Sequence, residues 1–275
     1  MPSLISPSQL LAQLGITTPA DIDLEVIAQF CGATIVYEAL AGCEACIIGV
    51  GDKATITVNR NSSRPRQRFS GGHELGHWIR DRGNVVFRCT ERELGAEWSH
   101  DNPELRANKF AADLLLPGEM FASHANGRPI TFDTVETLAD IFQTSFTATA
   151  IRLVEHGALP SMVICTDVRG RKWFMRSDIL PDNLWPHEVQ GRDTVAFKLH
   201  LEAGANPPGP TPVGAGQWIN HRNAERYVVT EDSRRTTSGL VLTLLWWQDE
   251  RQLLDLDDER EEEDDEDDRD RSDFD

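Results

Sequence analysis

Hydrophobic residues near the start of the chain recur with the period of an α-helix. Ser6 suits the N-cap of a first helix and Pro7 its first position, and the apolar residues that follow end at Gly15. Residues 22–30 repeat the helical pattern. The sequence therefore predicts two short helices before any strand.

The pattern then changes to apolar runs separated by turn residues. Gly42 interrupts the first connection, and Gly51 and Asp52 suit a tight turn in the second. Consecutive runs with such turns usually pair side by side, so a small antiparallel sheet is expected. The runs are 33–37, 45–50 and 54–59.

Two longer helices are expected after this sheet. Pro65 suits the first turn of a helix that starts near Ser63 and carries the sequence HELGH. Asn102 can cap the next helix, with Pro103 at its first position and Glu104 in its first turn. A Pro-Gly pair ends that helix.

Residues 126–160 indicate a helix-turn-helix-like segment. Asp133 and Glu136 have the spacing of a capping box, and Ser145 opens a second helix. Such a pair of helices more often packs than binds DNA, and Arg152 is the only permanently basic residue of the second helix. We expect packing rather than base reading.

Beyond Pro160 the pattern favours strands separated by Gly, Pro and Asn clusters. It predicts a mixed or antiparallel sheet domain, with residues 203–216 as a flexible loop. The expected strands are MVICTDV, RKWFMRS, TVAFKLHL, ERYVVTE and LVLTLLWW.

Charge is concentrated at the C-terminal end. The formal net charge is −18, and residues 255–275 contribute −12 of it, from 15 Asp or Glu against three Arg. We expect this acidic tail to be disordered, because it lacks apolar residues over almost its whole length. The remaining body is only mildly acidic, which argues against strong direct nucleic-acid binding.

Neither end of the chain resembles a targeting signal, and no run of about 18 apolar residues occurs. Five cysteines are too few and too sparse for a disulfide framework and fit a reducing compartment. We therefore expect a cytoplasmic protein without membrane association.

The HELGH sequence carries the candidate chemistry. His73 and His77 are four residues apart, so both imidazoles project from one helix face and can meet a single metal ion. Glu74 points toward the same cleft without needing to bind the metal. This pattern is typical of hydrolytic sites, in which the carboxylate takes a proton from the water that attacks a carbonyl.

Glu104 can complete the metal site, because two packed helices can bring its carboxylate to the ion. Three protein ligands without cysteine leave one position open, as in catalytic zinc sites. Zn²⁺ is the expected metal and Mn²⁺ the alternative, since zinc binds such ligands more tightly. Cys43 and Cys46 have the spacing of a structural site, but no second pair completes it, so we interpret them as small residues in or near a strand.

The run RQRFSGGHELGHWIRD, followed by ELRANKFAADLLLP, resembles the ImmA/IrrE family of metallopeptidases, whose members show HExxH and then E-x-x-A-N-x-F-A-A-x-L-L-x-P. The resemblance covers roughly residues 20–157. The C-terminal region with RTTSGLVLTLLWW is similar to a domain that follows the peptidase in some relatives.

The resemblance implies a gluzincin-like zinc site on His73, His77 and Glu104, with Glu74 as general base. It also implies cleavage of a helix-turn-helix transcriptional repressor, which releases stress-response or mobile-element genes. The expected fold is α+β. Its parts are a mainly helical zincin-like peptidase domain (1–125), the helix-turn-helix-like segment (126–160), a sheet-rich domain (161–254) and the acidic tail (255–275). The role of the sheet-rich domain is unknown, and a sensor is one interpretation.

Several neighbouring residues have two interpretations. The Gly71-Gly72 pair departs from the larger residues usual in relatives and suggests close approach of another backbone. Asn108 either orients Glu104 or is a buried amide that holds a loop. His100 and His124 either assist an oxyanion or are solvated loop histidines.

Two classes of function fit these features. The first is a zinc endopeptidase that cuts a helix-turn-helix repressor. The second is a metal-stabilised protein that sequesters a repressor without hydrolysis, which the C-terminal domain and the acidic tail would suit. The tail itself either mimics DNA and attracts a basic repressor or only increases solubility.

Overall fold

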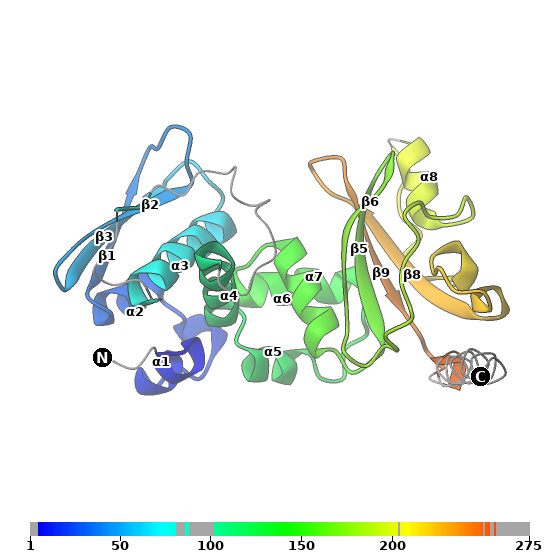
Figure 1. The fold of residues 1–275 in the computed structure, drawn as a ribbon, viewed down its shortest axis with the longest axis horizontal. Coiled ribbons are helices and arrows are strands. Elements are labelled where there is room, and N and C mark those ends of the chain that lie inside the picture. The colour runs from blue at the N-terminus through cyan, green and yellow to red at the C-terminus, as the bar shows by residue number, and fades with distance from the viewer. Residues whose placement is uncertain are drawn as a thin grey trace, which may run out of the picture. The chain divides into compact units, whose positions relative to one another are not determined.

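The computed structural model of the chain describes residues 5–80, 86–87, 102–202, 204–249, 251–253 and 256. Two compact units are present, each with its own sheet (Figure 1). The first comprises Met1–His124 and Thr137–Thr149, and the second Ala125–Glu136 and Ala150–Asp275. The predicted α+β class is confirmed, whereas the predicted domain boundaries stay predictions. No helix in the described part of the chain is long and apolar enough to cross a membrane.

The sheet of the first unit is mixed, so the prediction of an antiparallel sheet was wrong for one pair of strands. The strand order is β1-β3-β2-β4. β2 and β3 form the expected hairpin, whereas β1 pairs with β3 in parallel. The strands are β1 (Ala33–Glu38), β2 (Ala45–Val50), β3 (Lys53–Asn59) and β4 (Val86–Phe87).

The start of β1 is held against the start of β3 by a close backbone approach at Gly32. Its φ is +81°, and a Cβ there would lie 2.7 Å from the carbonyl oxygen of Asp52. The amide of Ala54 also donates to the carbonyl of Gly32 at 3.0 Å. These contacts align the starts of β1 and β3. The connection from β1 to β2 is longer than the turn from β2 to β3, which allows β2 to pair on the other side of β3.

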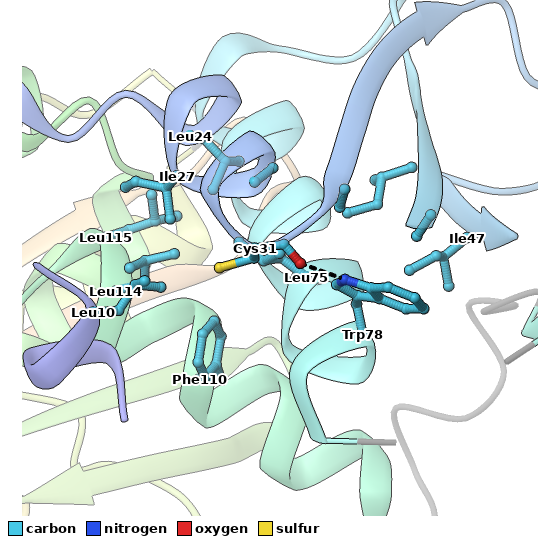
Figure 2. Packing of buried hydrophobic residues seen from close by; sticks show 14 of the residues in the cluster. Leu10, Leu24, Ile27, Cys31, Ile47, Leu75, Trp78, Phe110, Leu114 and Leu115 are labelled. Carbon is cyan, nitrogen blue, oxygen red and sulfur yellow. Dashed lines mark hydrogen bonds between the residues drawn. The ribbon is translucent and has the colours of Figure 1, made fainter. Parts of the chain in front are cut away.

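Helix α3 (Arg64–Arg80) packs on this sheet and is buried over much of its length. Figure 2 shows Leu75 and Trp78 of α3 among the apolar side chains of α2, β2 and α4. The indole nitrogen of Trp78 donates to the carbonyl of Cys31 at 2.8 Å. The core of the first unit therefore fixes α3 against the sheet and the preceding helix.

The expected helices of the first half are present. Ser6 caps α1 in a capping box with Gln9, and Asn102 caps α4. Ser145 accepts a hydrogen bond from the amide of Ala148 at the start of α7. The helices are α1 (Pro7–Gln13), α2 (Leu24–Phe30), α4 (Pro103–Leu115), α5 (Gly118–Ala125), α6 (Phe132–Phe142) and α7 (Phe146–His156), with a short 3₁₀ helix at Pro19–Asp21.

The capping box predicted at Asp133 and Glu136 was wrong. Helix α6 already begins at Phe132, whose amide donates to the buried carboxylate of Asp232 at 2.7 Å. Asp133 and Glu136 instead form ion pairs with Arg234. A side chain 100 residues away thus supplies a cap that local spacing cannot reveal.

The sheet of the second unit is antiparallel throughout, with the order β6-β5-β9-β8-β7. Four strands lie in predicted runs, but β7 lies in the segment expected to be a flexible loop. The strands are β5 (Ser161–Asp167), β6 (Gly170–Arg176), β7 (Thr211–Gly214), β8 (Val228–Arg235) and β9 (Val241–Trp246), with 3₁₀ helices at Ala215–Gln217 and Ala224–Arg226.

The run TVAFKLHL forms helix α8 (Val195–Leu201), not the predicted strand. Thr194 caps it, and the buried carboxylate of Glu231 accepts hydrogen bonds from the amides of Val195 and Ala196, at 3.1 and 2.8 Å. A helix start satisfied by a distant carboxylate overrides the β preference of the run. The predicted disordered tail lies outside the described residues, apart from Leu256.

Candidate metal centre

Helix α3 presents His73 and His77 from one face, as their spacing predicts. Both are buried, with 8% and 0% of their surface exposed, and Glu74 between them is 1% exposed. Their Nε2 atoms lie 3.1 Å apart. The two imidazoles therefore direct the same ring nitrogen to a common point.

Helix α4 brings Glu104 to that point. The side chain of Asn102 accepts a hydrogen bond from the amide of Glu104 at 3.0 Å, which fixes the first turn of the helix. The carboxylate oxygens of Glu104 lie 3.1 Å from His73 Nε2 and 3.2 Å from His77 Nε2. The predicted third residue thus joins the two histidines.

Small residues allow the two helices to approach closely enough for this contact. A Cβ on Gly76 would lie 3.2 Å from the Cα of Ala107, and one on Gly72 would lie 3.4 Å from the Cβ of Ala111. Gly71 faces the side chain of Leu24 instead. The close approach suggested by the Gly71-Gly72 pair is therefore made by Gly72, and more tightly by Gly76.

The donor atoms fit a small divalent metal ion. Ligand atoms about 2.0–2.1 Å from a tetrahedral centre are about 3.3 Å from one another. The three separations here are 3.1, 3.1 and 3.2 Å. Among the residues that the structure describes, His73, His77 and Glu104 form the one group of three such side chains able to hold a metal ion.

The electrostatics keep the third ligand ionised. Hydrogen bonding to His73, and then to His77, lowers the pKa of the Glu104 carboxyl far below its usual value and outweighs the opposing effect of burial. A carboxylate that stays deprotonated is ready to bind a cation at any physiological pH.

Asn108 contacts a histidine of this group. Its amide oxygen lies 2.9 Å from Nδ1 of His73. Since an amide oxygen can only accept, Nδ1 must carry the proton. A neutral ring held in this way has its lone pair on Nε2, where a metal can bind. The sequence suggested that Asn108 orients Glu104. In the structure, the rotation of α4 against α3 brings Asn108 to His73 instead.

The other residues considered in the sequence analysis do not join this group. His124 donates from Nδ1 to the carbonyl of Met120 at 2.8 Å, and its ring packs on Phe142. His100 lies outside the described residues. Cys43 and Cys46 belong to no group of three potential metal ligands in the described part of the chain.

Three comparisons relate this chain to known proteins. Residues 45–154 match the IrrE N-terminal-like domain of the M78 peptidase family. An uncharacterized immunity region protein of Bacillus phage phi105 is 38% identical over 72 residues, which cover 26% of this chain and 43% of that protein. A solved Mycobacterium tuberculosis transcriptional regulator shares the fold, with a TM-score of 0.57 at 14% identity over 87% of this chain and 74% of the other. The stretch 45–154 therefore matches the ImmA/IrrE family, as the two motifs within it indicated.

Proposed function

We propose that this protein is a zinc-dependent endopeptidase with a gluzincin-like site. The observation that supports it most strongly is the convergence of His73, His77 and Glu104 from two helices, with all three separations between 3.1 and 3.2 Å. Three protein ligands without a thiolate are the set found in catalytic rather than structural zinc sites. The match to a peptidase family supports the same reaction class.

In this proposal the ligands and Glu74 have separate tasks. A zinc ion bound by the three side chains would lower the pKa of water and polarise a substrate carbonyl. Glu74, which follows His73 directly and is buried on the same helix, takes the proton from the attacking water. It then gives that proton to the leaving amine, as a general base that becomes a general acid.

Zinc is the proposed metal, with manganese as the alternative. Two imidazole nitrogens and one carboxylate suit Zn²⁺, which binds nitrogen ligands more tightly than Mn²⁺ does. The Asn108 contact to His73 supports metal binding by this ring, because metal-binding histidines usually donate their other ring proton to an oxygen.

The proposed substrate is a helix-turn-helix repressor. The phage relative is named as an immunity region protein, which fits a role in gene regulation. DNA-binding repressors carry basic surfaces, and the formal charge of −18 on this chain attracts such a partner over distance. We place this reaction in the cytoplasm, where such a repressor acts.

A Glu74→Gln variant tests the proposed hydrolysis. Zinc binding should persist, because Glu74 is not among the ligands, whereas cleavage of the repressor encoded beside the gene should be lost. The measurement is metal content together with electrophoresis and mass spectrometry of the repressor, with and without chelator. Glu119→Gln, at an exposed glutamate of α5, serves as the matched control and should cleave normally. Cleavage by the Glu74→Gln protein at the normal rate would remove Glu74 from the mechanism.

The alternative is a metal-stabilised regulator that sequesters a repressor without hydrolysis. The well-packed second unit with its own core is the feature that favours it. In that case Glu74→Gln would retain the full regulatory effect in cells, and no cleaved repressor would accumulate. The endopeptidase predicts loss of both the effect and the product.

A further inference from the structure

Strand β6 and the turn before it carry four basic residues close together along the chain. Residues 168–176 read VRGRKWFMR, with four basic residues and no acidic one. We use the name basic–aromatic edge for the following residues: Arg169, Arg171, Lys172, Phe174, Arg176 and Trp185. β6 is the outer strand of its sheet, next to β5.

The aromatic rings of this edge are interleaved with guanidinium groups. Arg171 lies over the ring of Phe174 at 4.8 Å, and Phe174 meets Trp185 edge-on at 5.5 Å. Arg176 lies 5.9 Å from the Trp185 ring. The stack fixes the positions of both guanidinium groups. Arg176 also donates to the carbonyl of Pro181 and pairs with Asp182, so Arg171 is the stacked cation that can meet an anionic partner.

Two of these cations lack a carboxylate partner. Within the described residues, no carboxylate oxygen lies within 4.0 Å of Arg169 or Arg171, whereas Lys172 pairs with Asp167 at 3.4 Å. The comparable basic run at the start of α3 differs, because Arg64 and Arg66 pair with glutamates at 3.6 and 3.7 Å. The edge therefore has residual positive charge in a chain that is strongly acidic overall.

The surface is also hollowed and partly apolar. An open groove of about 440 Å³ lies along this edge. Its charged lining residues are the cations Arg169, Arg171 and Lys172 and the acids Asp167 and Glu188. Trp185 is 52% exposed and Val189 60% exposed. The carboxylates of an extended, acidic segment of peptide would meet Arg169 and Arg171 there.

The chain carries such a segment, and it begins beside this surface. The side-chain amide of Asn183 donates to the carbonyl of Leu256 at 3.1 Å, and Leu256 is buried in the core of the second unit. Asn183 lies two residues from Trp185 and directly after Asp182, which pairs with Arg176. Residues 257–275, which follow, contain 14 acidic residues and three arginines.

We propose that the basic–aromatic edge binds the acidic segment 257–275 of the same molecule. Nineteen residues reach at most about 65 Å when extended, far more than the short path from Leu256 to β6 requires. Tethering gives the segment an effective concentration in the millimolar range, so weak charge contacts suffice. The segment thereby shields the edge from other polyanions.

Zero-length carbodiimide cross-linking of the full-length protein tests this contact. The reagent joins an amine to a carboxylate that touches it, and Lys172 is the amine of the edge. Mass spectrometry should find products between Lys172 and the carboxylates of 257–275. The exposed Lys198 of the same unit should give few such products. The Lys172 products should be lost in roughly 1 M salt, where the screening length falls to about 3 Å.

A double variant with a matched control assigns the contact to named residues. Arg169→Gln with Arg171→Gln should remove the Lys172 products. Arg60→Gln with Arg235→Gln removes the same charge at exposed arginines that are not part of the edge as defined, and it should leave the products unchanged. Circular dichroism checks that all variants are folded.

Three results would overturn the proposal. One is cross-linking spread evenly over the exposed lysines, or unaffected by loss of Arg169 and Arg171. Another is cross-linking between heavy and light copies in an isotope-mixed sample, which would assign the edge to a second molecule. The third is absence of the product together with binding of a single-stranded dT20 oligonucleotide that depends on Arg171, which would assign the edge to nucleic acid.

Discussion

The orientation of His73 is set by one hydrogen bond. Asn108 accepts from Nδ1 at 2.9 Å, so the ring presents Nε2 to His77 and Glu104. Without this acceptor, the imidazole could rotate or change tautomer, and the metal would have to select the competent form at a cost in binding free energy.

Replacing Asn108 by Ala should therefore weaken metal binding without removing a ligand. The expected loss of affinity is about 10–100-fold, measured by competition with a chromophoric chelator. Asn108→Asp retains an acceptor and should recover most of the affinity. Lys109→Ala, at an exposed neighbouring position, is the control. Equal affinities in the Asn108→Ala and Lys109→Ala proteins would show that the contact does not position the histidine.

At the residue scale, local spacing was sufficient to single out the three side chains that converge, and insufficient to identify the residues that support them. His73 and His77 share a helix face through their separation alone, and Glu104 stands out as an acid in a capped first turn. The partner of Asn108 depends on how α4 is rotated against α3, which no local pattern encodes. The proposed roles of these residues stay predictions until metal is measured.

The site also depends on how closely two helices pack. α3 and α4 meet at Gly76, where an added Cβ would lie 3.2 Å from both the Cα of Ala107 and the Cβ of Phe110. Because the first atom belongs to the backbone, α4 would have to move as a whole. Glu104 would move with it.

Gly76→Ala should consequently destabilise the protein and weaken metal binding. Alanine gains about 1 kcal/mol of helix propensity over glycine, but overpacking costs roughly 1–3 kcal/mol. Gly72→Ala is the matched control, since its Cβ would make an ordinary contact at 3.4 Å and should be tolerated. Urea unfolding and metal titration of both variants provide the measurement. A Gly76→Ala protein as stable and as tight in metal binding as Gly72→Ala would contradict this account of the packing.

Elements were predictable where their signals are local. The caps at Ser6, Asn102 and Ser145 were confirmed, because each side chain bonds to an amide two or three residues ahead. The predictions failed where the deciding partner is distant. Glu231 stabilises the start of α8, and Asp232 that of α6, from a strand far along the chain.

At the scale of the molecule, the candidate metal site belongs to one of two units. Both helices that carry the proposed ligands lie in the unit containing β1 to β4, whereas β5 to β9 have a separate core. A ligand that binds only the folded form of one unit stabilises that unit by mass action. The effect of the same ligand on the stability of the other unit measures the coupling between the two units.

Zinc should therefore raise the stability of the first unit selectively. At 100 times its dissociation constant the gain is about 2.7 kcal/mol. Hydrogen exchange followed by mass spectrometry should show slower exchange in α3, α4 and β1 to β3, with little change in β5 to β9. The Glu104→Ala protein should show no such effect. Equal slowing in both units would indicate that they unfold as one.

X-ray absorption at the zinc edge tests the central claim most directly. For the purified protein loaded with one equivalent of zinc, we predict nitrogen and oxygen neighbours at about 2.0–2.1 Å, including two imidazoles, and no sulfur neighbour. The Glu104→Ala protein should lose the metal or show an altered oxygen shell. A sulfur shell at about 2.3 Å, or a spectrum unchanged when His73 and His77 are both replaced, would contradict the proposed site.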